Sequence, residues 1–122
     1  MAKELNRLKG GIGEGIAAKY LSQKGFQIIE TNWRTKYGEI DLIAADGKVL
    51  VFVEVKLKVG EDFGTPEEMI NKHKIFQVRR TAEYYLLTNN TNYEQQRMDA
   101  VAIVVEQNGE VLRINHYENI DN

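Results

Sequence analysis

The sequence lacks cysteine altogether and contains a single proline, Pro66, and a single serine among its 122 residues. Without cysteine the chain has no disulfide framework, no thiolate metal site and no thiol nucleophile. The one serine, Ser22, has no evident base partner, which argues against serine catalysis. We therefore examine the carboxylates and amines of the chain for its chemistry.

Long apolar runs are also missing. No stretch has the length of a signal peptide or a membrane span, so we expect a cytoplasmic protein with no membrane association. Hydrophobic residues make up 43% of the chain, enough for one core, and 122 residues are the size of one domain. We expect a single domain over residues 1–122, with about nine N-terminal and five C-terminal residues flexible.

Charge is distributed unevenly along the chain. Residues 1–80 hold 14 Lys/Arg against 11 Asp/Glu, whereas residues 81–122 hold 2 against 7, for a net charge of −2. If a phosphate backbone is the partner, it should contact the N-terminal two-thirds. The alternative is that the acidic tail is simply a solvated face.

Periodicity and turn signals predict seven main elements, in the order α-β-β-β-α-β-β. A mixed α/β sheet with flanking helices follows from this order. The second helix has a start signal at Thr65-Pro66-Glu67-Glu68 and a second one at Asn71. The expected helices cover residues 12–21 and 65–86, and the expected strands cover residues 26–34, 39–45, 48–57, 98–105 and 111–117.

Asp46-Gly47 separates two strand-like runs and is a strong hairpin signal. If these two residues form the turn, Glu54 lies opposite Glu39, and Asp41 is a diagonal neighbour of Glu54. Alternation along the strands places Ile40 on one face with Leu42 and Ala44, and it places the three acids on the other face.

Acids that converge at one end of a hairpin repel one another, and a divalent cation relieves that repulsion. Ligands that are all oxygen favour Mg²⁺ or Mn²⁺ over zinc. Lys56 follows Glu54 by two residues on the same face, where its ammonium can orient water or stabilise charge on a phosphate. A plain Glu54–Lys56 charge pair is the alternative, but residues 50–55 look buried on both faces, and a buried carboxylate needs a partner or an ion.

Glu14 lies in the first helix on a face shared with Ala17 and Leu21. It is either an exposed edge position or an additional acid of the metal site. The glycines around it invite a dinucleotide-binding interpretation, which fails because no strand precedes them and Ile16 occupies the third glycine position. We expect these glycines to permit close helix packing or approach to a phosphate backbone.

Several basic residues accompany these acids. Such residues usually form a solvated face, but beside a phosphodiester site they become candidates for a backbone clamp. The candidates for nucleic-acid binding are Arg34, Lys36, Lys58, Lys72, Lys74 and Arg79.

Three other polar residues receive no chemical role. His73 and His116 have no spacing that implies metal binding. Asp99 opens a strand just after Arg97, which favours a structural salt bridge or a turn role.

The chain resembles the YraN-like bacterial family of predicted endonucleases, which is distantly similar to archaeal Holliday-junction resolvases. As a combination the matching motifs are highly specific, and they extend from about residue 10 to residue 105. They are Gly13-Glu14 with Ala17 and Tyr20-Leu21, Asn32-Trp33-Arg34, Gly38 to Ala44, Val51 to Lys56, Phe63-Gly64-Thr65-Pro66, Lys74, Ala82, Tyr85-Leu86, and Arg97 to Val101.

That resemblance implies a restriction-endonuclease-like fold with a PD-(D/E)xK site, in which Ile40 replaces the motif proline. It implies that Asp41 and Glu54 bind Mg²⁺ or Mn²⁺ with the carbonyl of Val55, and that Lys56 is the motif lysine. Glu14 matches a helix glutamate of the resolvase-like branch, and Glu39 is a further candidate ligand. The expected partner is DNA, including branched DNA, and the expected assembly is a homodimer. The alternative is a module that binds nucleic acid without turnover.

Overall fold

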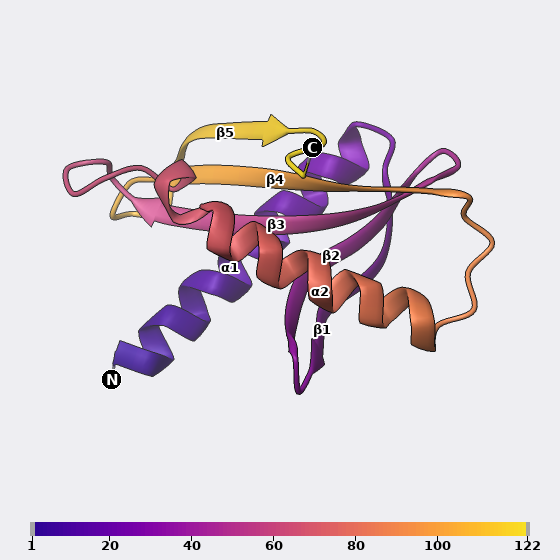
Figure 1. Cartoon of the computed structure of the whole chain (residues 1–122). Helices are drawn as coiled ribbons and strands as arrows, with labels where there is room; N and C mark the ends of the chain where they lie inside the picture. Colours follow the sequence, from indigo (N-terminus) through magenta and orange to yellow (C-terminus); the bar gives the residue numbers. More distant parts are fainter. Residues whose placement is uncertain (1, 122) are drawn as a thin grey trace.

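The computed structural model describes residues 2–121, with side chains from residue 11 onward (Figure 1). Its elements follow the order α-β-β-β-α-β-β, interrupted by one short 3-10 turn, which confirms the expected mixed α/β class. The elements are α1 (Ala2–Gln23), β1 (Gln27–Thr35), β2 (Gly38–Asp46), β3 (Val49–Val59), η1 (Glu67–Met69), α2 (Lys72–Thr88), β4 (Gln95–Val105) and β5 (Val111–Tyr117).

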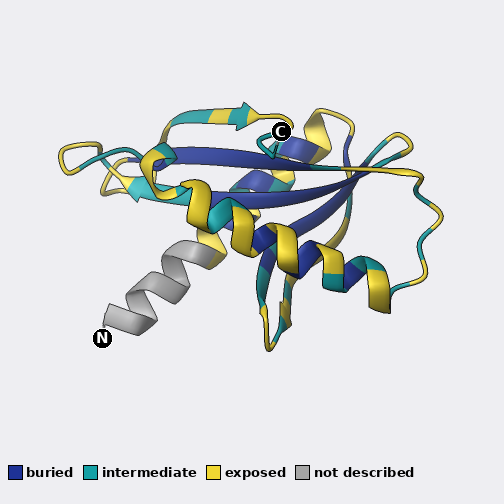
Figure 2. Ribbon diagram, viewed as in Figure 1, coloured by how far each residue is buried: buried dark blue, intermediate teal, exposed yellow. Residues whose placement is uncertain are grey.

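The five strands form one sheet in the order β1-β2-β3-β4-β5. Only β3 and β4 are parallel, and α2 provides the crossover between them. α1 packs on one face through Ala17 and Leu21, and α2 packs on the other through Ala82 and Tyr85. Of the five strands, β3 and β4 contain the largest numbers of buried residues, as Figure 2 shows by their dark blue ribbons.

The β2–β3 hairpin forms as expected, but its register differs from the predicted one by two residues. Asp46 pairs with Val49, so the turn is Gly47-Lys48 rather than Asp46-Gly47. Gly47 has a φ of +60°, the conformation required at the first central position of a type II′ turn. The shift moves the neighbour of Asp41 along β3 from Phe52 to Glu54, and a shift of two residues leaves each side chain on its own face.

The prediction that Ile40 shares a face of the sheet with Leu42 and Ala44 is wrong. Leu42 and Ala44 pack beneath α1, whereas Ile40 packs with Ile43 in the cluster beneath α2. Strict alternation is lost where β2 leaves β3, because the ladder between the two strands ends at Leu42–Val53. Beyond that pair β2 is paired with β1 alone, through Trp33–Ile40 and Arg34–Glu39, and the Ile40 side chain faces α2.

Both helices differ from prediction at their starts. Thr65 accepts a hydrogen bond from the backbone of Glu68 at 3.3 Å but begins only the 3-10 turn. α2 itself starts after Asn71, whose side chain accepts from the backbone N–H of Lys74 at 3.0 Å. α1 begins ten residues before the expected start at Ile12, at Ala2, and β4 begins at Gln95, in a stretch expected to be a loop.

Flexible residues were expected at both chain ends, and the structure describes contacts at the C-terminal end only. The first nine residues belong to the part of the chain whose side chains lie outside the description. At the other end, the backbone N–H of Ile120 donates to Met98 at 2.8 Å, and Asp121 pairs with Arg79 on α2. None of the helices within residues 2–121 is long and apolar enough to cross a membrane.

Candidate metal centre

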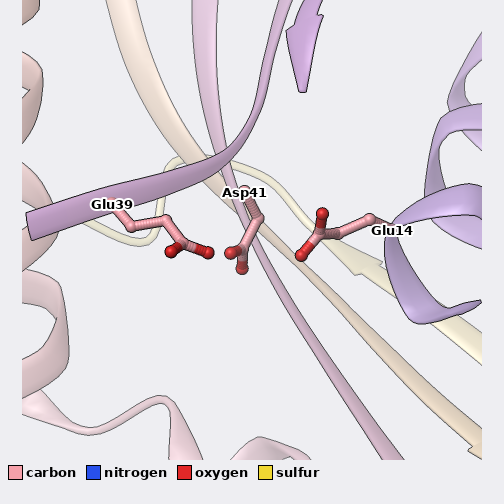
Figure 3. A group of neighbouring side chains, drawn as sticks. All are labelled: Glu14, Glu39 and Asp41. Atoms are coloured by element: carbon pink, nitrogen blue, oxygen red, sulfur yellow. The ribbon is translucent and has the colours of Figure 1, made fainter. Parts of the chain in front are cut away.

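Three carboxylates from two separate elements meet beside the sheet. Glu14 comes from α1, and Glu39 and Asp41 come from β2 (Figure 3). One oxygen of each lies within 4.8 Å of the others. The structure thus brings together three of the acids that the sequence predicted for the site, including both of those that were open questions.

Glu14 reaches this position because α1 packs very closely on the sheet. A Cβ on the preceding residue, Gly13, would lie 3.2 Å from the Cβ of Leu57 on β3, so this position favours glycine. Glu14 is 8% exposed, which rules out the exposed edge position. Its buried Oε1 has no hydrogen-bond partner among the described residues. A buried acceptor without a donor is rare in native proteins, and a bound cation is one partner that would satisfy it.

Asp41 lies where the β2–β3 ladder ends, and it accepts a hydrogen bond from the backbone N–H of Val55 at 2.8 Å through Oδ2. Its side chain thus takes the place of a backbone partner for β3. The N–H and C=O of one strand residue point toward the same side, so the Val55 carbonyl is directed toward the same gap.

Glu54 lies on β3 beside this gap and is 3% exposed. Its Oε2 accepts no hydrogen bond from the described residues, although Nζ of Lys74 on α2 lies 3.4 Å away as an ion-pair partner. The sequence indicated Lys74 only as a candidate for phosphate binding. Its contact with Glu54 depends on the packing of α2 over β3, which the sequence pattern does not reveal.

The proton affinity of these acids is abnormal. Burial, followed by the charge of Asp41, raises the pKa of Glu14 from 4.5 to about 7. Burial, with a further contribution from adjacent Glu54, also raises the pKa of Asp41, while Val55 and Lys56 act in the opposite direction. Both shifts mean that negative charge is crowded and poorly solvated in this site.

This arrangement fits a hard divalent cation. The available ligands are carboxylate and carbonyl oxygens, which suit Mg²⁺ or Mn²⁺. A bound cation would satisfy the unpaired Oε1 of Glu14 and would relieve the crowding that raises the two pKa values. Lys56 is half-buried next to these acids and forms no salt bridge within residues 11–121, so its ammonium is available to a ligand.

We expect Glu14→Gln to stabilise the metal-free protein at pH 8. The pKa of Glu14 is about 7 in the folded protein and 4.5 in the unfolded chain. The folded protein therefore becomes less stable as the pH rises from 4.5 to 7, because Glu14 must give up its proton in a buried place. The variant avoids this loss, which corresponds to about 3 kcal/mol. Urea denaturation in EDTA should show similar stabilities at pH 4.5 and a more stable variant at pH 8.

Glu110→Gln is the matched control, because Glu110 is an exposed acid on the β4–β5 turn. It should leave the pH dependence unchanged. An equal pH dependence in wild type and Glu14→Gln would contradict the assignment of a crowded, buried carboxyl.

The predicted basic residues do not share one environment. Arg34 binds Glu39 at 3.0 Å on the β1–β2 hairpin, and Lys36 at its tip lies 5.3 Å from the ring centre of Tyr37. Arg79 pairs with Asp121. Lys72 is exposed at the start of α2, and Lys58 is half-buried on β3. Contacts of these residues with phosphate stay a prediction.

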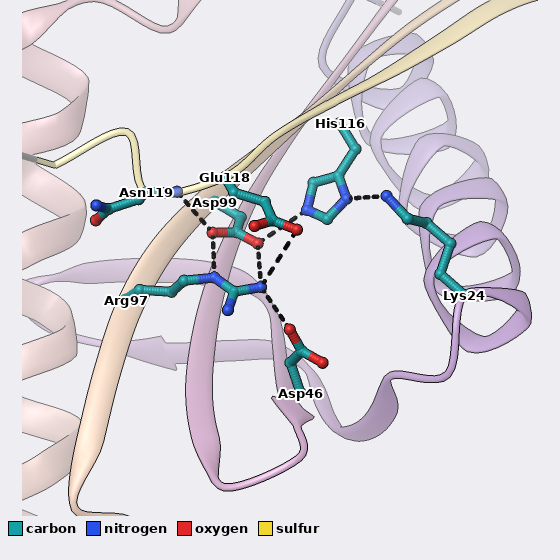
Figure 4. A network of polar contacts seen from close by, with 7 residues as sticks. All are labelled: Lys24, Asp46, Arg97, Asp99, His116, Glu118 and Asn119. Carbon is teal, nitrogen blue, oxygen red and sulfur yellow. Dashed lines mark hydrogen bonds and ion pairs between the residues drawn. The ribbon is translucent and has the colours of Figure 1, made fainter.

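A second charged cluster lies away from these acids (Figure 4). Asp99 is fully buried and binds Arg97 at 2.9 Å, which confirms the structural salt bridge. Asp99 also binds Nε2 of His116 at 2.8 Å, and Nδ1 of His116 lies 2.7 Å from Nζ of Lys24. The sequence did not predict these last contacts, because they join β4 and β5 to the turn after α1.

Comparison with known proteins places this chain in a family. The family model described as "Uncharacterised protein family UPF0102" matches residues 13–103. A UPF0102 protein of Alkaliphilus oremlandii is 40% identical over 115 residues, covering 94% of this chain and 98% of the relative. The corresponding values are 44% over 100 residues, 82% and 85% for Rhodococcus opacus, and 38% over 116 residues, 95% and 97% for Pelotomaculum thermopropionicum. The chain therefore belongs to the UPF0102 family, the YraN-like family that its motifs indicated.

Proposed function

We propose that this protein is a Mg²⁺- or Mn²⁺-dependent endonuclease that hydrolyses DNA phosphodiester bonds, including those of branched DNA. The main support is the convergence of Glu14, Glu39 and Asp41, with a buried Glu14 oxygen that no described residue satisfies. Family membership alone does not assign this activity.

Asp41, Glu54 and the Val55 carbonyl would hold the metal, and Glu14 with Glu39 would add ligands on the α1 side. The bound cation would supply a polarised phosphate oxygen and a water of lowered pKa. The acids come from three different elements, so their relative positions are fixed by the packing of α1 and β2 against β3. Rigid placement of this kind is what metal-assisted hydrolysis requires.

Lys56 lies where it could orient water or stabilise negative charge. Its charge acts on Asp41, and it follows Glu54 on the same strand face. In this site it would orient the attacking water or stabilise the negative charge that develops on the phosphate. Lys74 would hold Glu54 in place through the contact at 3.4 Å.

A nucleic-acid-binding module without turnover is the alternative. Buried acids oppose it, because a binder gains nothing from anions that face phosphate. Metal dependence separates the two functions: a binder should hold DNA equally well in EDTA, whereas the proposed enzyme should bind or cleave it only with a divalent cation.

The direct test is a panel of linear, nicked, flapped and four-way DNAs incubated with Mg²⁺ or Mn²⁺. We expect cleavage of at least one DNA, none in EDTA, and none by Glu54→Gln purified in parallel, which controls for contaminating nuclease. The absence of cleavage from the whole panel, or equal cleavage by Glu54→Gln, would overturn the proposal. Light scattering of the same samples would show whether the active species is the expected homodimer.

A further inference from the structure

A pocket of about 220 Å³ lies between the tip of the β1–β2 hairpin and the outer face of α2. Its walls are the side chains of Tyr37, Arg80, Glu83, Tyr84 and Leu87. Tyr37 and Leu87 are 45% and 85% exposed and belong to neither core cluster. Their side chains are therefore available to a ligand in the pocket.

The pocket is preformed. A Cβ on Gly38 would lie 2.7 Å from Oγ1 of Thr81, so the hairpin tip approaches α2 too closely for another residue. The backbone N–H of Tyr37 donates to Thr35 Oγ1 at 3.0 Å, and the Tyr37 and Tyr84 rings meet edge to face at 5.0 Å. The aromatic walls are therefore fixed before any ligand arrives, which lowers the entropy lost on binding.

The chemistry of the pocket suits a nucleobase. Tyrosine rings and a guanidinium plane are the groups on which unpaired bases stack. Glu83 offers a carboxylate that can accept from the exocyclic amine of a base. Arg80 lines the same pocket, and a guanidinium beside two tyrosine rings suits a ligand that carries both a base and a phosphate.

The pocket also lies within reach of the metal centre. Tyr37 in the turn and Glu39 on β2 are two residues apart, so their Cα atoms are at most about 7 Å apart. One or two nucleotides of a DNA strand cover that span. A strand whose phosphate lies at the acids therefore places a nearby base at the hairpin tip.

We propose that this pocket binds an unpaired base of the DNA, one or two nucleotides from the phosphate to be cut. This inference rests on the proposed function and narrows its substrate class to DNA with an unpaired or extruded base next to the cleavage point. A fully paired duplex keeps its bases stacked and offers the pocket nothing unless a base is flipped out.

The test measures DNA binding in Ca²⁺ without requiring turnover. Two 5′-labelled duplexes are compared, identical except that one carries a single unpaired 2-aminopurine. We expect wild type to quench the 2-aminopurine fluorescence, and Tyr37→Ala to abolish the quenching and weaken this binding about 10-fold. Binding to the paired duplex should change less than about twofold, and Tyr37→Trp should retain the quenching.

Phe63→Ala is the matched control, since Phe63 is 96% exposed on a different loop, and it should behave as wild type. If Tyr37→Ala fails to fold, Arg80→Ala on the outer face of α2 replaces it with the same expectation. Equal weakening of both duplexes, no effect of either variant, or an altered oligomeric mass with unchanged DNA binding would overturn the inference. If wild type binds none of the DNAs, the proposed function itself fails.

Discussion

Lys56→Met should reduce the rate of DNA cleavage about 10²- to 10⁴-fold while leaving metal binding nearly intact. The ammonium lies beside the acids without being a metal ligand, so its removal takes away proton transfer or charge stabilisation in the transition state. Single-turnover cleavage gives the rate, and isothermal titration with Mn²⁺ gives the affinity.

Asp41→Asn should behave differently in the same two assays. It removes the charge at the centre of the site, so both Mn²⁺ binding and cleavage should be lost. Lys48→Met is a matched control, because Lys48 is an exposed lysine in the β2–β3 turn. If Lys56→Met cleaves at the wild-type rate, the lysine has no part in the chemistry.

Asp99→Asn should destabilise the protein by about 3–5 kcal/mol. Asp99 is fully buried, and its carboxylate binds Arg97, His116 and the backbone N–H of Asn119 at 2.9, 2.8 and 3.0 Å. The variant leaves the arginine charge without its buried partner, while the other contacts are weakened. Thermal unfolding at pH 7 should show a Tm lower by more than about 10 °C.

The pH dependence gives a second check. The charged contacts of Asp99, opposed by its burial, hold its pKa below the ordinary value, so its stabilising effect is present at neutral pH and lost as the solution becomes acidic. Wild type and Asp99→Asn should therefore approach each other in stability below about pH 4. Glu118→Gln, at an exposed position 3.8 Å from Arg97, should change the stability by less than about 1 kcal/mol. A comparable loss in both variants would contradict a special role for Asp99.

The order of elements could be predicted because each element has its own periodicity and end signals, as Asn71 shows for α2. The predicted turn of the β2–β3 hairpin was misplaced by one residue. Asp46-Gly47 and Gly47-Lys48 are both acceptable two-residue turns, and the choice is made by packing along the whole hairpin. The predicted face of Ile40 was wrong for a related reason: β2 loses its pairing with β3 beyond Leu42, and strict alternation does not continue past that point.

The site was predictable to the extent that its residues are local in sequence. Asp41, Glu54 and Lys56 lie on neighbouring strands. The apolar sequence of β3 predicted a buried strand, and a buried carboxylate such as Glu54 needs a partner or an ion. Lys74 was not predicted as a partner of Glu54, and His116 was not predicted as a partner of Asp99, because each contact joins elements that are distant in the chain. Sequence separation gives no indication of which of many charged residues will meet.

The parallel β3–β4 pair has a consequence for how the chain folds. The first three strands pair through short hairpins, whereas Val51 meets Arg97 only after the intervening chain has closed a loop of 46 residues. Contacts so distant in sequence form slowly, so the β1–β2–β3 meander should form before β4 docks. Three of the four acids of the candidate site, Glu39, Asp41 and Glu54, lie in this meander, and Glu14 comes from α1, just before it in the chain. These carboxylates therefore repel one another while the chain is still folding. A divalent cation in the refolding buffer should accelerate the formation of this part of the fold.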